Sequence, residues 1–132
     1  MRRVVPLSSS SGTDARALAE TRYHGAVDSL ATGDFPAAIS GFRASLEADA
    51  SFADASHGLL HALKAAGQLD EAVAVAQQLI VADPDDILAY TSLSILYQHQ
   101  GKIAEAEAAA TRAKLLGWKR ELREQKASES HK

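Results

Sequence analysis

The sequence predicts an all-α protein built from stacked helical hairpins, on the strength of three observations. First, Gly33, Gly67 and Gly101 lie 34 residues apart, and an alanine five positions after each glycine keeps the same interval. An internal repeat of this length is typical of helical-hairpin arrays. Second, 46% of the residues are hydrophobic but only 5% are aromatic, which favours close-packed helices over strands. Third, apolar residues after each glycine recur at steps of three and four, which places them on one helix face.

The repeat also predicts how the chain is organised. A chain of 132 residues is expected to form one domain. Residues 1–14, which include a serine run, are expected to be a flexible segment, and the first helix is expected to begin near Ala15. The repeat domain is expected over residues 15–127. Each repeat contains a helix, a glycine turn and a second helix, and the three repeats are residues 19–52, 53–86 and 87–120.

The end of the chain is expected to contain a separate capping helix. The sequence predicts a break at Gly117, a short helix over about 118–127 and a flexible tail over 128–132. Trp118 and Leu122 are four residues apart and are expected to pack as a narrow seam against the third repeat. A polar terminal helix suits a finite array, because the last repeat would otherwise expose its stacking face.

Composition excludes several classes of protein. The chain has no cysteine, so neither a disulfide framework nor a thiolate metal site can form. No stretch approaches the roughly 18 consecutive apolar residues of a membrane span, and the first residues are a poor match to a secretory signal. We therefore expect a cytoplasmic protein that does not insert into membranes.

Charge is distributed unevenly along the chain. The net charge is −3, but residues 13–110 carry −9 and residues 111–132 carry +4. The favoured interpretation of this asymmetry is ordinary solvated helix faces and a soluble tail; steering of a partner or alignment of neighbouring copies is the alternative. Glu121 and Glu124 interrupt the basic segment, so no nucleic-acid partner is expected.

Three in-register copies of a motif give the chain its family resemblance. The first copy contains Gly33, Phe35, Ala38, Phe42 and Leu46; the second contains Gly67, Leu69, Ala72, Asp83 and Pro84; the third contains Tyr90, Leu93, Tyr97, Gly101, Ala106 and Ala113. Over residues 19–120 the chain resembles a tetratricopeptide-repeat protein. The resemblance implies an α-solenoid, a right-handed superhelix of three antiparallel helix-turn-helix repeats with a terminal helix. It also implies a role in protein–protein interaction.

The resemblance further implies a binding groove on the concave face, which the first helices of the repeats line. Mapped onto this sequence, the groove residues are Tyr23, Val27, His57, His61, Lys64, Thr91, Ile95 and Gln98. This set is apolar and aromatic at one end and basic in its middle. Such a surface suits an extended peptide or a partner helix that carries a hydrophobic anchor and an acidic group.

No residue pattern predicts catalysis, a metal or a cofactor. His57 and His61 are four residues apart on one predicted helix, a spacing that can bind a divalent metal, but no third ligand is evident nearby. A nucleophile elbow, a phosphate-binding loop and a dinucleotide fingerprint are all missing from the sequence.

The sequence favours two functions over a third, a metal- or ligand-responsive sensor built on His57 and His61. The first is a non-catalytic interaction module or scaffold that binds a partner protein segment in its concave groove and supports assembly of a larger complex. The second is a self-assembling structural protein, whose copies dock through the ends of the array and through the charge asymmetry.

Overall fold

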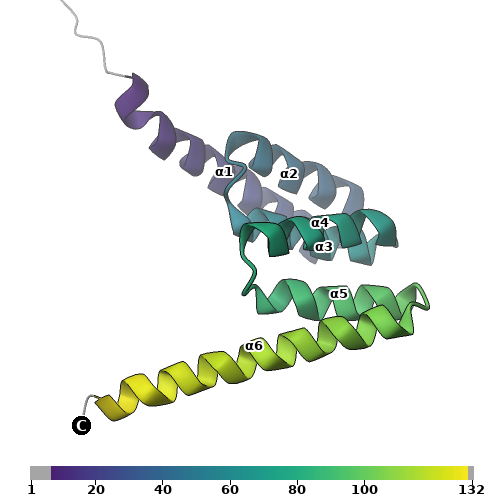
Figure 1. Ribbon diagram of the computed structural model, residues 1–132. Coiled ribbons are helices and arrows are strands. Elements are labelled where there is room, and N and C mark those ends of the chain that lie inside the picture. The colour runs from purple at the N-terminus through teal and green to yellow at the C-terminus, as the bar shows by residue number, and fades with distance from the viewer. Residues whose placement is uncertain (1–6, 131–132) are drawn as a thin grey trace, which may run out of the picture. The chain divides into compact units, whose positions relative to one another are not determined.

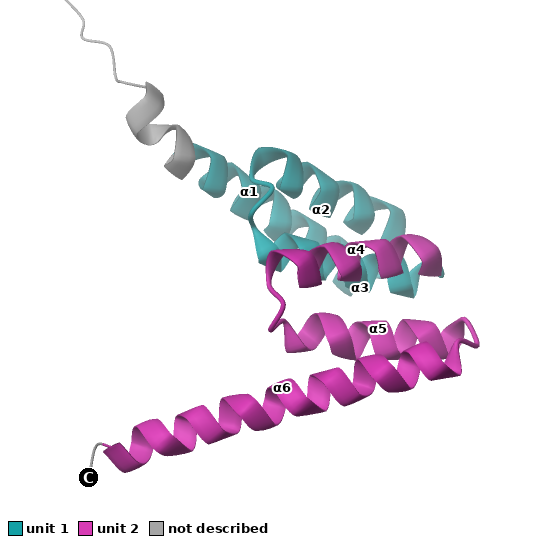
Figure 2. Ribbon diagram, in the orientation of Figure 1, with its two compact units in different colours: residues 1–67 teal, residues 68–132 magenta. Residues whose placement is uncertain are grey.

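The computed structural model describes residues 7–130, and their regular elements are helices (Figure 1). The helices are α1 (Leu7–Ala31), α2 (Phe35–Ala48), α3 (Ala53–Ala65), α4 (Leu69–Ala82), α5 (Ile87–His99) and α6 (Ile103–Ser130). The chain forms two compact units, which meet in the sequence after Gly67 (Figure 2). Unit 1 contains α1 to α3 and unit 2 contains α4 to α6.

The three repeat glycines end helices, as the sequence predicts. Gly33, Gly67 and Gly101 have φ angles of 82°, 80° and 76°, in the left-handed region that favours glycine. After α1, the Asp34 N–H donates to the Ser29 carbonyl at 2.9 Å and the Gly33 N–H donates to the Leu30 carbonyl at 3.1 Å. This pair of bonds is the Schellman pattern, which satisfies carbonyls that the helix leaves without partners.

Unit 1 has a core of small side chains around one large ring. Ala19, Ala26 and Ala38 are buried, which lets α1 and α2 approach closely, and Phe42 of α2 is fully buried among them. The Phe42 ring lies directly over Gly58 of α3, where a β-carbon would come within 2.3 Å of the ring. The absence of a side chain at this glycine is therefore what lets α3 pack against α2.

Polar groups of unit 1 also join α1 to α2. The buried Ser45 hydroxyl donates to the Ala19 carbonyl at 2.6 Å, and the Arg22 guanidinium donates to the Ala44 carbonyl at 2.9 Å. Both bonds use backbone carbonyls as acceptors. The Ser45 bond satisfies a hydroxyl that burial would otherwise leave without a partner.

Unit 2 is organised around α5. Leu93 and Leu96 of α5 are buried, and α6 contributes Ala106, Ala109 and Leu116 to the buried surface. Helix α5 begins at the N-cap Asp86, whose carboxylate accepts a hydrogen bond from the Ala89 N–H at 3.0 Å. Two further bonds link α4 to the residues around the C-terminus of α5: Gln77 to the Tyr97 hydroxyl at 3.3 Å, and Gln100 to Asp70 at 2.7 Å.

The first helix begins earlier than expected. We expected residues 1–14 to be flexible and a helix to begin near Ala15, but α1 already begins at Leu7. Residues 1–6 lie outside the described range. Serine is only modestly worse than alanine in a helix, and no proline follows Pro6 before the end of α1, so the serine run does not force a later start.

The predicted capping helix is not a separate element. Helix α6 runs without interruption from Ile103 to Ser130, through the expected break at Gly117 and into the expected tail. A single glycine costs a helix only about 1 kcal/mol, and most residues that follow are good helix formers. The prediction that Trp118 and Leu122 pack against the third repeat is also wrong, because these side chains are 55% and 65% exposed.

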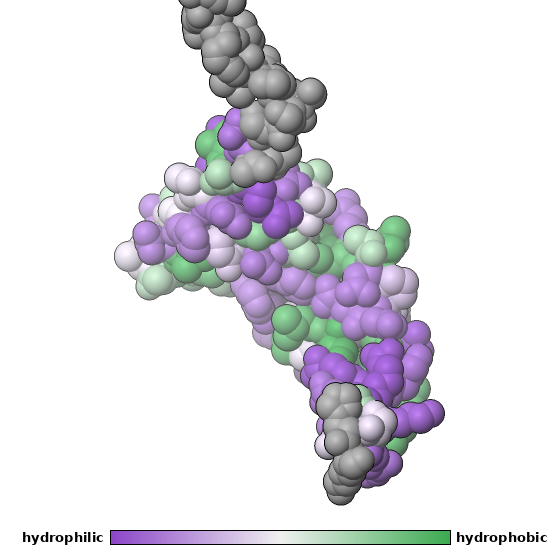
Figure 3. All heavy atoms as spheres, turned by 90° about the vertical axis from the view of Figure 1, so that its left-hand side faces the viewer, coloured by the Kyte–Doolittle hydropathy of each residue, from purple (hydrophilic) through white to green (hydrophobic). Residues whose placement is uncertain are grey.

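The surface mixes hydrophilic and hydrophobic residues. On the face shown in Figure 3, hydrophobic residues lie in separate patches among hydrophilic ones. Val81 of α4 is the most exposed large hydrophobic residue of the described range, at 84%. None of the helices of residues 7–130 combines the length and the hydropathy that crossing a bilayer requires.

Candidate protein-interaction surfaces

Three predicted site residues share one face of α3 in unit 1. His57, His61 and Lys64 are separated by four and three residues, so they lie along one side of the helix. His61 is exposed, while His57 and Lys64 are half-buried. The leucines Leu59 and Leu63 are buried and fix the rotation of the helix. We call His57, His61 and Lys64 the α3 polar face.

The charges of the α3 polar face interact with one another. Desolvation by the surrounding protein lowers the pKa of His61 below its ordinary value of 6.5, and the positive charges of Lys64 and His57 lower it further. At neutral pH the His61 imidazole is therefore mostly in its uncharged form. An acidic group placed beside it would favour the charged form and raise its pKa again.

The predicted site residues of α1 have unequal roles. Tyr23 is half-buried, and its ring centroid lies 5.3 Å from that of Phe52 and 5.7 Å from that of Phe42. These distances are those of stabilising aromatic pairs, so Tyr23 belongs to the packing of unit 1 as well as to its surface. Val27, one turn further along α1, is 37% exposed and presents an apolar side chain to solvent.

The remaining predicted residues lie on α5 in unit 2. Thr91, Ile95 and Gln98 are separated by four and three residues and share one helix face. Thr91 and Gln98 are exposed and Ile95 is half-buried. The Thr91 hydroxyl donates to the Ile87 carbonyl of its own helix at 3.0 Å. This face therefore presents a methyl group, an aliphatic side chain and an amide, and it carries no charge.

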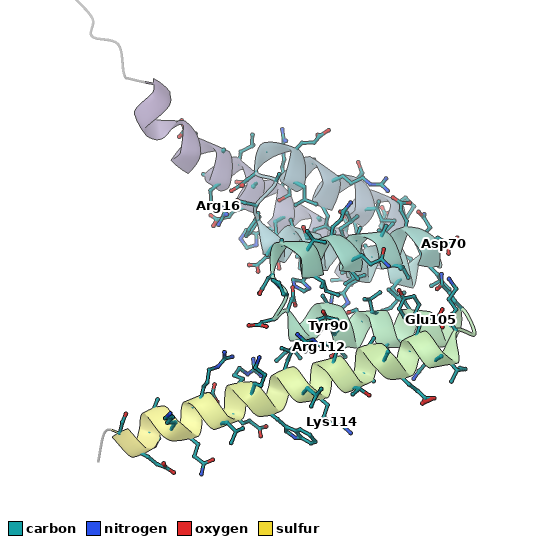
Figure 4. The ribbon with its side chains drawn as sticks, in the orientation of Figure 1. Arg16, Asp70, Tyr90, Glu105, Arg112 and Lys114 are labelled. Atoms are coloured by element: carbon teal, nitrogen blue, oxygen red, sulfur yellow. The ribbon has the colours of Figure 1, made fainter. Side chains whose placement is uncertain are left out.

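Sequence reasoning did not anticipate a charged cluster at the junction of α1 and α3. Arg16 lies 2.7 Å from the Asp49 carboxylate and 4.6 Å from the centroid of the Phe52 ring (Figure 4 labels Arg16). Hydrogen bonds from Ser51 and from Arg16 lower the pKa of the Asp49 carboxyl to about 2. The partners are 33 residues apart, so no local pattern signals them. The cluster holds α1 against the α2–α3 turn.

A shallow hollow on α4 was also not predicted. It has a volume of about 350 Å³, and its lining includes Ala74, Gln77, Gln78 and Val81. The sequence signal was present, because Val81 lies one position beyond the apolar pair Leu79 and Ile80. The exposure of Val81 depends on the rotation of α4 about its axis. The packing of the buried Ala76 and Leu79 sets this rotation.

The side chains of these surfaces hold no metal-binding constellation. Within the described part of the chain, no three His, Asp or Glu side chains come together in a way that could bind a metal ion. The surfaces offer imidazole, ammonium, amide and aliphatic groups, whose chemistry suits reversible binding of a polypeptide.

Comparison with known proteins identifies the family. The tetratricopeptide repeat profile matches residues 29–94, which is half of the chain. Together with the helix–glycine turn–helix repeat, this match shows that the chain belongs to the tetratricopeptide-repeat family. No match was found among curated proteins.

Solved structures share the fold. The crystal structure of MamA superposes with a TM-score of 0.74 at 24% identity, over 77% of this chain and 60% of MamA. This chain therefore spans less than two thirds of MamA. The translocator chaperone SycD of the Yersinia enterocolitica type III secretion system, crystallised as an alternative dimer, superposes with a TM-score of 0.74 at 24% identity. That alignment covers 87% of this chain and 88% of SycD.

Proposed function

We propose that this chain is a non-catalytic interaction module that binds a segment of a partner protein and so supports assembly of a larger complex. Membership of the tetratricopeptide-repeat family supports a role in protein interaction, and the α3 polar face is the single observation that carries the choice of surface. A cytoplasmic setting is part of the proposal, since a cysteine-free chain fits a reducing compartment.

The chemistry of unit 1 suggests what the segment contains. Lys64 and the uncharged His61 favour an acidic group, because its charge would pair with the ammonium and draw a proton onto the imidazole. Val27 favours a hydrophobic anchor. The α5 face of Thr91, Ile95 and Gln98 is proposed as an additional contact surface for a partner of the same kind.

A matched pair of charge reversals tests the surface. Lys64→Glu reverses the charge of the α3 polar face, and Arg120→Glu makes the same change at an exposed position of α6. In an affinity capture from the native lysate, a specific partner should be retained by the unmodified chain and by Arg120→Glu but lost by Lys64→Glu. Circular dichroism checks that all three chains are folded. Equal capture by both variants would reject the α3 polar face as the binding surface.

The pH dependence of binding gives a second readout once that partner segment is available as a peptide. Because the pKa of His61 lies below 6.5, the imidazole gains a proton and a positive charge as the pH falls below neutral. Affinity for an acidic segment should therefore rise as the pH is lowered from about 7.5 to about 5.5. His61→Gln should flatten the profile, and an unchanged profile in this variant would exclude His61 from the contact.

A further inference from the structure

Helix α6 extends well beyond the helix that it packs against. With a rise of 1.5 Å per residue, the 13 residues of α5 span about 20 Å and the 28 residues of α6 about 42 Å (Figure 1). The last buried residue of α6 is Leu116, and every side chain from Trp118 to Ser130 is exposed. The distal half of α6 is thus a helix without a packing partner in unit 2.

An apolar stripe runs along this helix. Leu115, Trp118 and Leu122 are 43%, 55% and 65% exposed, and they are separated by three and four residues. At 100° per residue, the stripe lies on the side of α6 roughly opposite to Ala109 and Leu116, which are buried. We call these three residues the α6 stripe. Steps of three and four are the spacing of a coiled-coil seam.

Charged residues border the α6 stripe on both sides. One border is wholly basic and consists of Arg112, Lys119 and Lys126; the other alternates in sign and consists of Glu107, Lys114 and Glu121. All six side chains are exposed, and within the described part of the chain none forms an ion pair. Figure 4 shows Lys114 pointing away from α5.

We propose that the α6 stripe pairs two copies of this chain as a parallel helical dimer. In a parallel pair, a residue on one border lies opposite the residue five positions further along on the other border of the second copy. Glu121 then lies opposite Lys126, and Glu107 lies opposite Arg112. Both pairs are attractive, and each occurs twice in the dimer because of its two-fold symmetry. Lys114 lies opposite Lys119, which is the one repulsive pair between the borders. Glu129, seven residues after Leu122 on the line of the stripe, faces its own counterpart and adds repulsion at the end of the helix. The mixed border of each copy thus complements the basic border of the other copy at two of its three positions.

The reverse orientation is less favourable. An antiparallel pair brings each border against its own counterpart, so the basic border of Arg112, Lys119 and Lys126 faces itself. A partner with only acidic borders would match the basic border but would repel Glu107 and Glu121. Of these partners, only a second copy in the parallel orientation forms attractive charge pairs along both borders.

The pairing should be closed and weak. It has two-fold symmetry and stops at two copies, unlike head-to-tail docking of array ends. Three apolar side chains fall short of the roughly 800 Å² per partner of a standard interface, so a dissociation constant of about 10–100 µM is expected.

Sedimentation equilibrium of the full chain tests the dimer. Between about 5 and 500 µM, the mean mass should rise from that of the monomer towards that of the dimer and no further. Leu122→Glu should weaken the dimer by more than about tenfold. Ala127→Glu is the matched control, because it adds the same charge at an exposed position on another side of the helix and should leave the dimer intact.

Two charge reversals test the orientation. Lys114→Glu converts the repulsive pair into an attractive one, so it should tighten a parallel dimer by about three- to tenfold; it would weaken an antiparallel dimer, where Lys114 faces Glu121. Lys126→Glu should weaken the parallel dimer by a similar factor. A chain that stays monomeric at all concentrations, equal effects of Leu122→Glu and Ala127→Glu, or a weaker dimer in Lys114→Glu would each overturn the proposal.

Discussion

At the scale of single residues, the packing of unit 1 depends on the absence of a side chain at Gly58. The Phe42 ring is fully buried and occupies the space where a side chain on α3 would project. A methyl group there would lie within 2.3 to 2.8 Å of three ring atoms, well inside van der Waals contact. The Phe42 ring cannot move away from an added methyl group at low energetic cost, because a buried ring in a close-packed interior has no free space around it.

We therefore predict that Gly58→Ala destabilises the protein. Overpacking of this kind costs about 1–3 kcal/mol, measured as the change in the free energy of unfolding in urea. Gly25→Ala is the control: Gly25 lies in α1 with no atom within 4 Å of the added methyl group, so this change should be neutral or stabilise by up to about 1 kcal/mol. If the two variants were equally stable, α3 would not depend on the contact with Phe42.

At the scale of elements, glycine has opposite roles in α6 and in the turn before it. Gly101 has a φ of 76° and ends α5, whereas Gly117 lies inside α6, where a β-carbon would meet no atom within 4 Å beyond its own helix backbone and chain neighbours. The left-handed conformation disfavours any residue with a β-carbon. A helical glycine, by contrast, only adds backbone entropy to the unfolded chain.

The same substitution should therefore have opposite effects at the two positions. Gly117→Ala should stabilise the protein by about 0.5–1 kcal/mol and Gly101→Ala should destabilise it by about 1–2 kcal/mol. Thermal unfolding followed by circular dichroism at 222 nm measures both changes. A destabilised Gly117→Ala variant would contradict two features of α6 at this position: the helix continues through Gly117, and there is space for a β-carbon.

At the scale of the whole molecule, the distal half of α6 contributes surface rather than core. Residues 118–130 are all exposed, and they carry four basic and three acidic side chains. Long charged side chains on an exposed helix favour solubility and association kinetics more than folding stability.

Removal of residues 118–132 should consequently leave the fold intact. The shortened chain should keep a cooperative unfolding transition, with a midpoint within about 5 °C of the full chain, because none of the described residues that are removed, 118–130, is buried. Differential scanning calorimetry at low protein concentration makes this comparison without a contribution from dimerisation. Loss of cooperative unfolding would mean that the removed segment is required by the core.

Much of this architecture follows from local pattern. The 34-residue interval predicts the three glycine turns, and each glycine indeed has a positive φ. The spacing of His57, His61 and Lys64 places them on one helix face without any knowledge of packing. The start of α1 and the continuity of α6 were missed, because the serine run and Gly117 weaken a helix by amounts that do not by themselves end one.

By itself, the sequence determined the repeat, the turns, the helical faces and the family, since each depends on residues close together along the chain. Only the tertiary structure decided which side chains those faces bury. Tyr23 packs on Phe52, Phe42 packs on Gly58 and Arg16 pairs with Asp49, all across intervals that no local pattern encodes. The same holds for the α6 stripe, which is exposed because the packing of Ala109 and Leu116 turns the opposite side of α6 to solvent. Burial is a property of contacts between distant segments, whereas helix formation depends on near neighbours.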